Sequence, residues 1–501
     1  MFWIKKNNDP AQSKKSIAKF IDQMKTNPDF SHFHHEGKQF SCWISFIVTL
    51  VDLEYVHRDL LPALYSDRVH SIEDIAKVLP ADKLIRTKNL SEIQSGILDG
   101  SLMIRESAHS KECLLIPCMK KQSRPVEQSE TETSILGPHE SFVESLETNI
   151  NLIRSRIPIP QLKVEELRVG KISRTRVSVL YVEGIANKEN INTVIQRISD
   201  LETISLISSN MLYLMISDNN HSIFPQFIDT ERPDRVSGAL YEGKIAVIVD
   251  GSPNALILPS TIVEFFSAFD DYSLVWMLAS AYRLLRLFAI GFSVISSPLY
   301  VALLTYHYQL VPKDLLATLI VSRSSVPYDP IIEVLLLEIM IELLREAGAR
   351  LPTKVGQTIG IVGGIVIGTA SVQAGITSNI LLIIIAMSAL AAFITPNYRM
   401  ATTIRLIRFP FIISAQLLGI LGIALCFMIC VCHLLKLTSL GHPYIEPIYP
   451  LRVTDLKDSF VRLPLNLQTQ RPLFLRTGDK NRANPQRVNK KEGKHSPDID
   501  E

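Results

Sequence analysis

Residues 287–307 read LFAIGFSVISSPLYVALLTYH, a run of 21 residues without Asp, Glu, Lys or Arg. At about 1.5 Å per residue, a helix of this length crosses a hydrocarbon core about 30 Å thick. Ser297 and Pro298 lie near the middle of the run and predict a kink, which a helix bundle tolerates when its neighbours satisfy the freed carbonyl group. We therefore expect part of the chain to lie in a membrane.

Three further apolar runs predict a polytopic α-helical membrane domain over residues 272–440. They cover residues 358–375, 378–394 and 409–434. Four spans place both ends of the chain in the cytoplasm, whereas a fifth crossing, through the charged residues 331–350, would place the C-terminal tail outside. The four-span topology turns Arg399, Arg405 and Arg408 outward, against the positive-inside tendency.

The rest of the chain has the composition of a soluble protein. The 501 residues include 52 Lys+Arg and 50 Asp+Glu, and most of these charges precede residue 271 or follow residue 451. This near balance argues against a general nucleic-acid binder, which needs a clear surplus of cations. The N-terminus has neither the apolar run nor the small-residue cleavage site of a secretory signal. We expect the N-terminal region to be cytoplasmic.

Alternating strand and helix patterns predict two α/β subdomains in this N-terminal region. They are expected over residues 1–120 and 137–271, with a polar linker at residues 121–136. In the second, GKIAVIVDGSPNALILPS at residues 243–260 predicts a hairpin, because Asp, Gly, Ser and Pro separate its two apolar runs. Residues 441–501 form a polar cytoplasmic tail whose end is expected to be disordered.

No pattern typical of a catalytic, cofactor or metal site is present in the sequence. It contains no Ser-His-Asp arrangement, Walker loop or HExxH motif, and its six cysteines form no C-x-x-C pair. His32, His34 and His35 cluster in a segment that we interpret as a polar loop, which is a weak metal candidate. We predict a protein that is not an enzyme, has no cofactor or metal, and buries its cysteines as small apolar residues.

Glycines at intervals of four residues form the most regular pattern in the apolar half. Gly356, Gly360, Gly364 and Gly368 lie on one broad face of a predicted helix, followed by the polar Thr369. A glycine face lets another helix approach closely, so helix packing is one interpretation. The other is that this face lines a central axis or pore, where small residues leave space.

A charged stripe on residues 331–350 is the second pattern. Glu338, Glu342, Glu346 and Arg350 follow one another at intervals of four on an otherwise apolar helix. Because carboxylates in lipid are costly, the helix either lies at the interface with a Glu–Arg pair or turns its stripe toward protein or water. In the second case, the stripe would form a cation-attracting vestibule.

Taken together, seven segments resemble the A subunit of GerA-type spore germination receptors. The resemblance covers most of residues 137–472. Its segments are GPHESFVESLETNINLIRSRI from residue 137, FPQFIDTERPDRVSGALYEGKIAVIVDGSPNALILP from 224, DDYSLVWMLASAYRLLR from 270, SPLYVALLTYHYQLVP from 297, VPYDPIIEVLLLEIMIELLREAGARLP from 326, VGQTIGIVGGIVIGTASVQAG from 355 and PYIEPIYPLRVTDLKDSFVRLP from 443. Thr369 departs from the family pattern, in which glutamine is more frequent.

The resemblance implies a multi-pass protein of the spore inner membrane. It implies a nutrient receptor with two partners, a permease-like B subunit and a lipoprotein C subunit. The complex would trigger germination with early release of monovalent cations, and the A subunit would be an oligomeric component that forms or gates a cation channel. None of these properties follows from composition or spacing.

A second class of function is a secondary transporter with a cytoplasmic regulatory region. The Ser297-Pro298 kink and the glycine-rich run then correspond to broken helices at a substrate site. The chain has too few spans for the usual inverted repeats, and no duplicated segment is evident. A membrane-bound enzyme, the third class, lacks a catalytic constellation.

Overall fold

The computed structural model describes residues 17–66, 69–79, 84–108, 110, 112–119, 132, 137–351, 353–452, 455–464 and 468–482. The side chains of residues 73, 76, 77, 353–362 and 457 are outside this description, as is nearly all of the predicted linker. The chain forms two compact units. The α/β unit comprises residues 1–217, 227–259 and 469–501, and the helical unit comprises residues 218–226 and 260–468.

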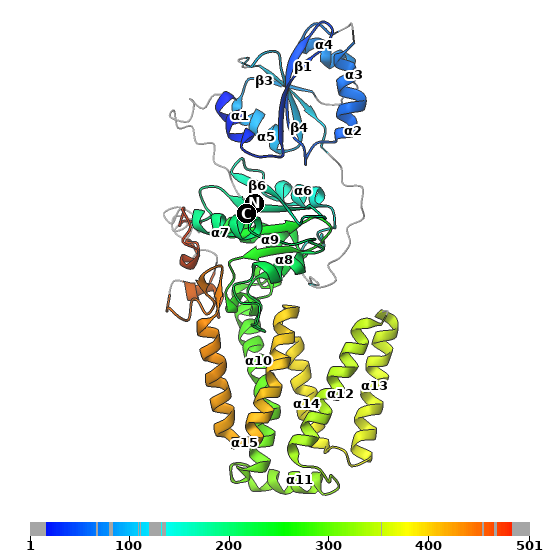
Figure 1. The fold of residues 1–501 in the computed structure, drawn as a ribbon, viewed down its shortest axis with the longest axis vertical. Helices are drawn as coiled ribbons and strands as arrows, with labels where there is room; N and C mark the ends of the chain where they lie inside the picture. The colour runs from blue at the N-terminus through cyan, green and yellow to red at the C-terminus, as the bar shows by residue number, and fades with distance from the viewer. Residues whose placement is uncertain are drawn as a thin grey trace, which may run out of the picture. The chain divides into compact units, whose positions relative to one another are not determined.

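The first sheet of the α/β unit has five antiparallel strands in the order β1-β2-β4-β5-β3. These strands are β1 (Phe30–Glu36), β2 (Ser41–Ile47), β3 (Ile85–Thr87), β4 (Ser101–Arg105) and β5 (Cys113–Pro117). Alternate residues of β4 and β5 enter two separate apolar clusters, one on each face of the sheet. Helices cover both faces (Figure 1), and they are α1 (Ile17–Lys25), α2 (Leu53–Tyr55), η2 (Val56–Leu60), α3 (Leu61–Leu64), α4 (Ile72–Val78) and α5 (Leu90–Leu98).

The second sheet repeats this arrangement with five antiparallel strands in the order β6-β7-β9-β10-β8. These strands are β6 (Leu162–Val169), β7 (Thr175–Val182), β8 (Ile228–Thr230), β9 (Ile245–Val249) and β10 (Ala255–Leu258). Its helices are α6 (Leu146–Arg156), α7 (Lys188–Ser199), α8 (Ser209–Ile216) and α9 (Pro233–Glu242). The predicted hairpin is confirmed as β9–β10, and Gly251 in its turn has a φ of +82°. The prediction of an N-terminal α/β region is confirmed by these two sheets, and its division into two subdomains stays a prediction.

The interpretation of the histidine cluster as a loop is wrong, because the cluster lies on strand β1. His32, His34 and His35 pair with residues of β2, and the rings of His32 and His34 pack against Trp43. The alternation was hard to recognise because the strand is at a sheet edge and polar side chains are tolerated there. Among the described residues, no group of three or more His, Cys, Asp or Glu side chains is placed to hold a metal ion.

Three of the six cysteines are buried at the first sheet, as predicted, but the prediction of burial is wrong for the three on α15, because Cys426 and Cys430 are half-buried and Cys432 is exposed. Cys42 and Cys113 lie on strands β2 and β5, and Cys118 follows β5. Burial raises the pKa of the Cys42 thiol to about 12 and those of Cys113 and Cys118 to about 11. These thiols therefore act as small apolar side chains.

Long helices form the helical unit, and Figure 1 shows them running back and forth with α11 lying across one end. They are α10 (Trp276–Thr305), α11 (Lys313–Arg323), α12 (Pro330–Arg350), α13 (Thr353–Gln373), α14 (Asn379–Phe393) and α15 (Tyr398–Lys436). Among the described residues, α10 and α15 are long and apolar enough to cross a membrane, and α14 is a shorter apolar helix. Helix α10 contains residues 287–305 of the first predicted span, and α15 contains all of 409–434. Full polytopic insertion stays a prediction.

Helix α15 is not the single straight span that residues 409–434 predict. Gly419 has non-helical angles, with φ 61° and ψ −139°, and divides the helix into a first limb, residues 398–418, and a second limb, residues 420–436. A Cβ atom added at Gly422 would overlap the carbonyl oxygen of Ser414, eight positions earlier, so the second limb folds back along the first. Because of this reversal, the second limb of α15 ends at the end of the bundle where α10 begins (Figure 1).

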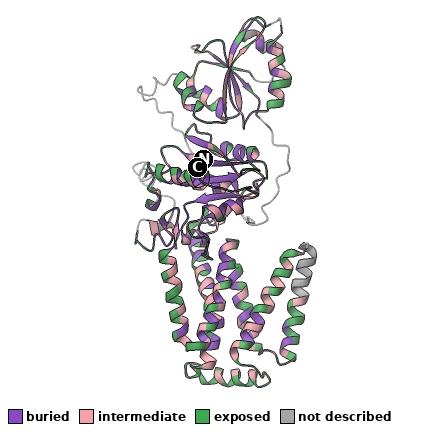
Figure 2. Cartoon of the chain, viewed as in Figure 1, coloured by how far each residue is buried: buried purple, intermediate pink, exposed green. Residues whose placement is uncertain are grey.

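The polar tail contains more structure than its composition predicts. It contributes β12 (His442–Pro443), which pairs with β11 (Thr438–Ser439), and η6 (Asp455–Asp458) to the helical unit. It also contributes η8 (Leu473–Leu475) to the α/β unit. Tyr444 and Leu475 are fully buried. Figure 2 shows burial concentrated in the strands of both sheets, whereas many outward positions of the long helices are exposed. The predicted disordered end lies outside the described residues.

Candidate functional site: a charged core in the helical unit

A buried ion pair joins α12 to the first limb of α15. The guanidinium of Arg408 donates to a carboxylate oxygen of Glu338 over 2.6 Å. Its other terminal nitrogen donates to the Ser293 hydroxyl over 2.7 Å, and the Ser297 hydroxyl donates to Glu338 over 2.8 Å. We call these four residues the charged core, because Glu338 and Arg408 are only 5% and 3% exposed.

The charged core connects three helices that are distant in sequence. Ser293 and Ser297 come from α10, Glu338 from α12 and Arg408 from α15. Ionised groups inside an apolar bundle are costly unless they are paired and hydrogen-bonded, and here both conditions hold. Loss of either charge would leave the other buried without a counter-ion, so the pair constrains how the three helices pack.

A second buried carboxylate, Glu333, connects the loops at the other end of α12. It is 0% exposed and receives hydrogen bonds from the backbone N–H of Ser378 (2.7 Å), the Thr377 hydroxyl (3.3 Å) and the Arg323 guanidinium (3.1 Å). The carboxylate therefore joins α11 and α12 to the start of α14. Sequence reasoning missed Glu333, because an acidic residue near a helix N-terminus usually interacts favourably with the helix dipole at an exposed site.

The remaining residues of the predicted stripe have different surroundings. Glu342 pairs with Arg345 one turn later and lies 3.9 Å from Arg405 of α15. Glu346 and Arg350 form an exposed i,i+4 pair with an N–O distance of 2.6 Å. The stripe therefore passes from a buried interhelical contact at Glu338 to an ordinary surface pair at the end of α12.

In the described part of the glycine ladder of α13, neither Gly364 nor Gly368 packs against α12. Gly363, which lies beside the ladder, faces α12, and a Cβ atom there would lie 2.8 Å from a methyl group of Leu344. Among the described atoms, none lies within 4 Å of the Cβ position at Gly364, and at Gly368 the nearest is a Leu382 methyl at 3.6 Å. Thr369 is exposed and donates to the Ile365 carbonyl of its own helix.

Two further ladder residues, Gly356 and Gly360, are in the part of α13 whose surroundings are outside the described residues. Gly364 is in the described part of the ladder. Among the described atoms, none covers α13 at Gly364, so this position is open to lipid, water or another molecule, whereas Gly368 is buried beside Leu382 of α14.

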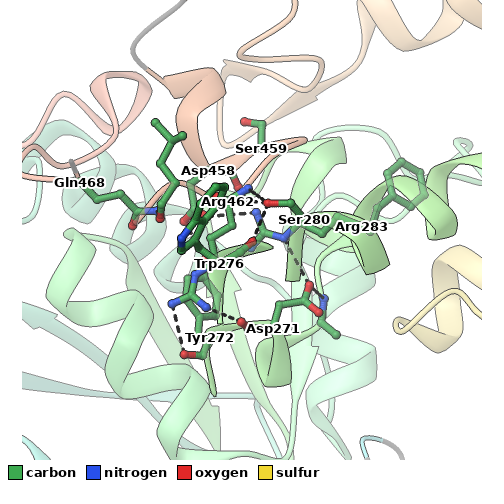
Figure 3. A network of polar contacts seen from close by, with 12 residues as sticks. Asp271, Tyr272, Trp276, Ser280, Arg283, Asp458, Ser459, Arg462 and Gln468 are labelled. Carbon is green, nitrogen blue, oxygen red and sulfur yellow. Dashed lines mark hydrogen bonds and ion pairs between the residues drawn. The ribbon is translucent and has the colours of Figure 1, made fainter. Parts of the chain in front are cut away.

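A polar network holds the tail segment around residues 458–462 against the beginning of α10 (Figure 3). At its centre is Asp271, 2% exposed, whose carboxylate accepts from Arg283 (3.3 Å) and Arg286 (3.1 Å). Arg283 also donates to Asp458, over 2.5 Å to its carbonyl oxygen and 3.0 Å to its carboxylate.

Arg462 completes this network from the tail side. Its guanidinium donates to the carbonyl oxygens of Asp271 (2.5 Å) and Leu274 (2.9 Å), and it lies 5.1 Å from the centre of the Tyr272 ring. Its backbone N–H donates to the Ser280 hydroxyl over 3.1 Å. The carbonyl groups that precede α10 are thus satisfied by a residue about 190 positions later. The segments that begin at residues 270 and 443 contain these residues, and neither segment has a sequence pattern that predicts their contact.

Comparison with known proteins shows the family of this chain. The model of the family described as "Bacillus/Clostridium GerA spore germination protein" matches residues 18–474. The chain belongs to this GerA family. This membership confirms the resemblance found in the sequence and extends it through the first sheet, where the sequence resemblance was weaker.

Two relatives align with this GerA-family chain over nearly all of its length. Spore germination protein GerQA of Bacillus cereus is 48% identical over 98% of this chain and 99% of its own. Spore germination protein GerIA of Bacillus cereus is 43% identical over 97% of this chain and 72% of its own. Neither name describes an enzyme.

Among solved structures, the N-terminal domain of the A subunit of the Bacillus megaterium spore germinant receptor GerK3 matches with a TM-score of 0.34 and 23% identity. This match covers 48% of this chain and 91% of that one.

Proposed function

We propose that this chain is the membrane-embedded A subunit of a nutrient-sensing spore germination receptor, and that it forms or gates a cation-conducting path. Membership of the GerA family supports the role in germination. The long apolar helices α10 and α15 support location in a membrane, which for a germination protein is the spore inner membrane. The α/β unit then faces the cytoplasm, and the complex includes a permease-like B subunit and a lipoprotein C subunit.

The observation that carries the channel role is the open position at Gly364 of the α13 glycine ladder. Gly364 has open space beside it among the described atoms, whereas its neighbour Gly363 packs on α12. A helix with an open glycine position and an exposed threonine is suited to meet other copies around an axis. In an oligomer, several such faces would surround a path narrow enough to select ions. The stripe residues Glu338, Glu342, Glu346 and Arg350 would lie in the helix behind this face.

The experiment compares two glycine positions that have equal space in the chain but different proposed roles. Gly364→Leu places a bulky side chain on the α13 face, and Gly291→Leu places the same side chain on α10, where the described atoms also leave open space. Spores carrying each substitution are tested for the amount of the protein in the membrane and for cation release after nutrient. We expect Gly364→Leu to impair assembly or release and Gly291→Leu to leave both unchanged.

A milder substitution separates packing from conduction. Gly364→Ala should keep the amount of protein normal and change cation release, either as a leak without nutrient or as slower release after it. Normal amount and normal release in both Gly364 variants would refute a role for this face in assembly or conduction.

The secondary transporter is the second candidate, and the reversal of α15 at Gly419 is the observation in its favour. Broken helices are common at transporter substrate sites. The two functions differ in what moves: a channel subunit produces nutrient-triggered cation flux, whereas a transporter produces uptake of substrate in fixed stoichiometry with an ion. Reconstituted receptor complexes measured for both fluxes distinguish them.

A further inference from the structure

Three guanidinium groups converge where α12 lies against the first limb of α15. Glu342 interacts with both Arg345 of its own helix and Arg405 of α15, and Arg408 pairs with Glu338 one turn away. Arg345 also lies within electrostatic range of Arg405 and Arg408. We call Arg345, Arg405 and Arg408 the arginine cluster, and its side chains are 22%, 11% and 4% exposed.

The arginine cluster has more positive charge than its neighbouring carboxylates neutralise. Three guanidinium groups share Glu338 and Glu342, and the next acidic side chain, Glu346, is paired with Arg350. Among the described residues, the Nε atoms of Arg405 and Arg408 are buried without a hydrogen-bond partner. A surplus cation with unsatisfied donors in a poorly hydrated site favours a bound anion.

The depth of the cluster fits the boundary between headgroups and acyl chains. Arg405 is seven residues from the start of α15 and Arg345 is five residues from the end of α12, which is about 10 Å and about 8 Å along the two helices. The pairs Glu338–Arg408 and Glu342–Arg405 show that the helices run antiparallel, so these two ends lie together. Positive side chains at this level are typical of the cytoplasmic side of a membrane protein.

Exposed apolar side chains occupy the same turns of the two helices. Ile339 and Leu343 of α12 are 48% and 65% exposed, and Leu406 of α15 is 52% exposed. A ligand that combines an anionic group with hydrocarbon would match both the cluster and these side chains, whereas a free anion would match only the cluster.

We propose that the arginine cluster binds the phosphate group of an anionic phospholipid between α12 and the first limb of α15. Guanidinium groups bind phosphate oxygens in a fork geometry, and Arg345 and Arg405 supply two such groups from adjacent helices. Arg408 remains paired with Glu338 and adds its charge from the inner side. The lipid would join the last turns of α12 to the first turns of α15.

The test uses the full chain, purified in neutral detergent and exchanged into lipid nanodiscs. Nanodiscs contain phosphatidylcholine alone or phosphatidylcholine mixed with phosphatidylglycerol, and lipids retained by the protein after extraction are counted by native mass spectrometry. We expect selective retention of phosphatidylglycerol. Loss of one basic residue should weaken phosphatidylglycerol retention about fivefold. The double variant Arg345→Gln, Arg405→Gln should therefore weaken it about 25-fold.

Arg350→Gln is the matched control, because it removes the same charge from the same helix at a side chain that is 78% exposed and paired with Glu346. It should retain phosphatidylglycerol like the unmodified protein. If the double glutamine variant does not stay monodisperse, Arg345→Lys with Arg405→Lys keeps the charge, removes the fork geometry and should give intermediate retention.

Three results would overturn the proposal. They are equal retention of phosphatidylglycerol by the double glutamine variant and the unmodified protein, equal retention of both lipids by the unmodified protein, and displacement of phosphatidylglycerol by inorganic phosphate. The proposal rests on the membrane location given under the proposed function. A chain that stays in solution without detergent would refute that location, whereas a detergent-dependent chain indifferent to lipid charge would refute the lipid site alone.

Discussion

Replacing Arg408 by methionine should strongly destabilise the helical unit, because it leaves the Glu338 carboxylate buried without a counter-ion. The pair has an N–O distance of 2.6 Å, and both side chains are nearly inaccessible. Two unit charges about 4 Å apart interact with about 4 kcal/mol at an effective dielectric constant of about 20. Removing one partner of a buried pair typically costs about 3–5 kcal/mol, which is the same range.

The double variant Glu338→Met, Arg408→Met separates loss of the charge pair from loss of packing. It removes both charges, so we expect it to recover most of the stability that Arg408→Met loses. Glu346→Gln is the surface control and should lower the free energy of unfolding by no more than about 0.5 kcal/mol, because the Glu346 side chain is 62% exposed.

The assay is thermal unfolding of the full chain in a fixed neutral detergent, followed by loss of monodisperse protein. The midpoint should be lowest for Arg408→Met, intermediate for the double variant and unchanged for Glu346→Gln. An Arg408→Met midpoint within error of the surface control would refute the assignment of the pair as a structural constraint. A double variant less stable than Arg408→Met would show that the charges are not the reason for the loss.

Three other predictions concern the reversal of α15, the tail and the first sheet. Gly419→Ala should lower the free energy of unfolding by about 1–3 kcal/mol, because Gly419 has a φ of +61° and an added Cβ would lie 2.7 Å from Nε2 of His307. The midpoint of thermal unfolding in detergent measures this loss, and Gly291→Ala is the neutral control. Ending the chain at residue 468 removes the buried Phe474 and Leu475. This truncation should lower the free energy of unfolding of the α/β unit by about 3–6 kcal/mol and make the unit sensitive to protease. Burial, aided by Lys25 and Arg105, lowers the pKa of His32 from 6.5 to about 4, so the unfolded chain binds more protons between these values. Stability of the first sheet should therefore fall as the pH drops from about 6.5 toward 4, and His32→Gln should flatten this dependence in urea unfolding followed by Trp43 fluorescence. A dependence that persists in the variant would assign it to other groups.

Several elements were predictable because their signals are local. The hairpin at β9–β10 follows from two apolar runs around a Gly-containing turn, and the long apolar helix α10 follows from residues 287–307. Strand β1 was missed because its histidines lie on a sheet edge, where period-two burial is weak. The reversal at Gly419 was missed because a glycine within an apolar run is common in membrane helices, and only its backbone angles distinguish a turn from a helix.

The candidate sites were less predictable than the elements that carry them. The charged stripe was recognised from its spacing of four residues, but spacing alone treats Glu338, Glu342 and Glu346 as equivalent. In the structure they differ from 5% exposed for Glu338 to 62% side-chain exposure for Glu346. Arg405 and Arg408 counted against the expected topology, whereas in the folded chain they lie beside these glutamates.

Apolar length, helical period and turn chemistry were enough to determine the α/β character of the N-terminal region and the apolar helices. These properties depend on residues close together in the chain. The partner of each buried charge depends on which helices pack together and on where α15 reverses. Arg408 meets Glu338 seventy positions away, and Arg462 meets the carbonyl groups before α10 across about 190 positions, because packing in three dimensions brings them together. No local pattern encodes such pairs, since the same residues would remain exposed if the helices packed in another order.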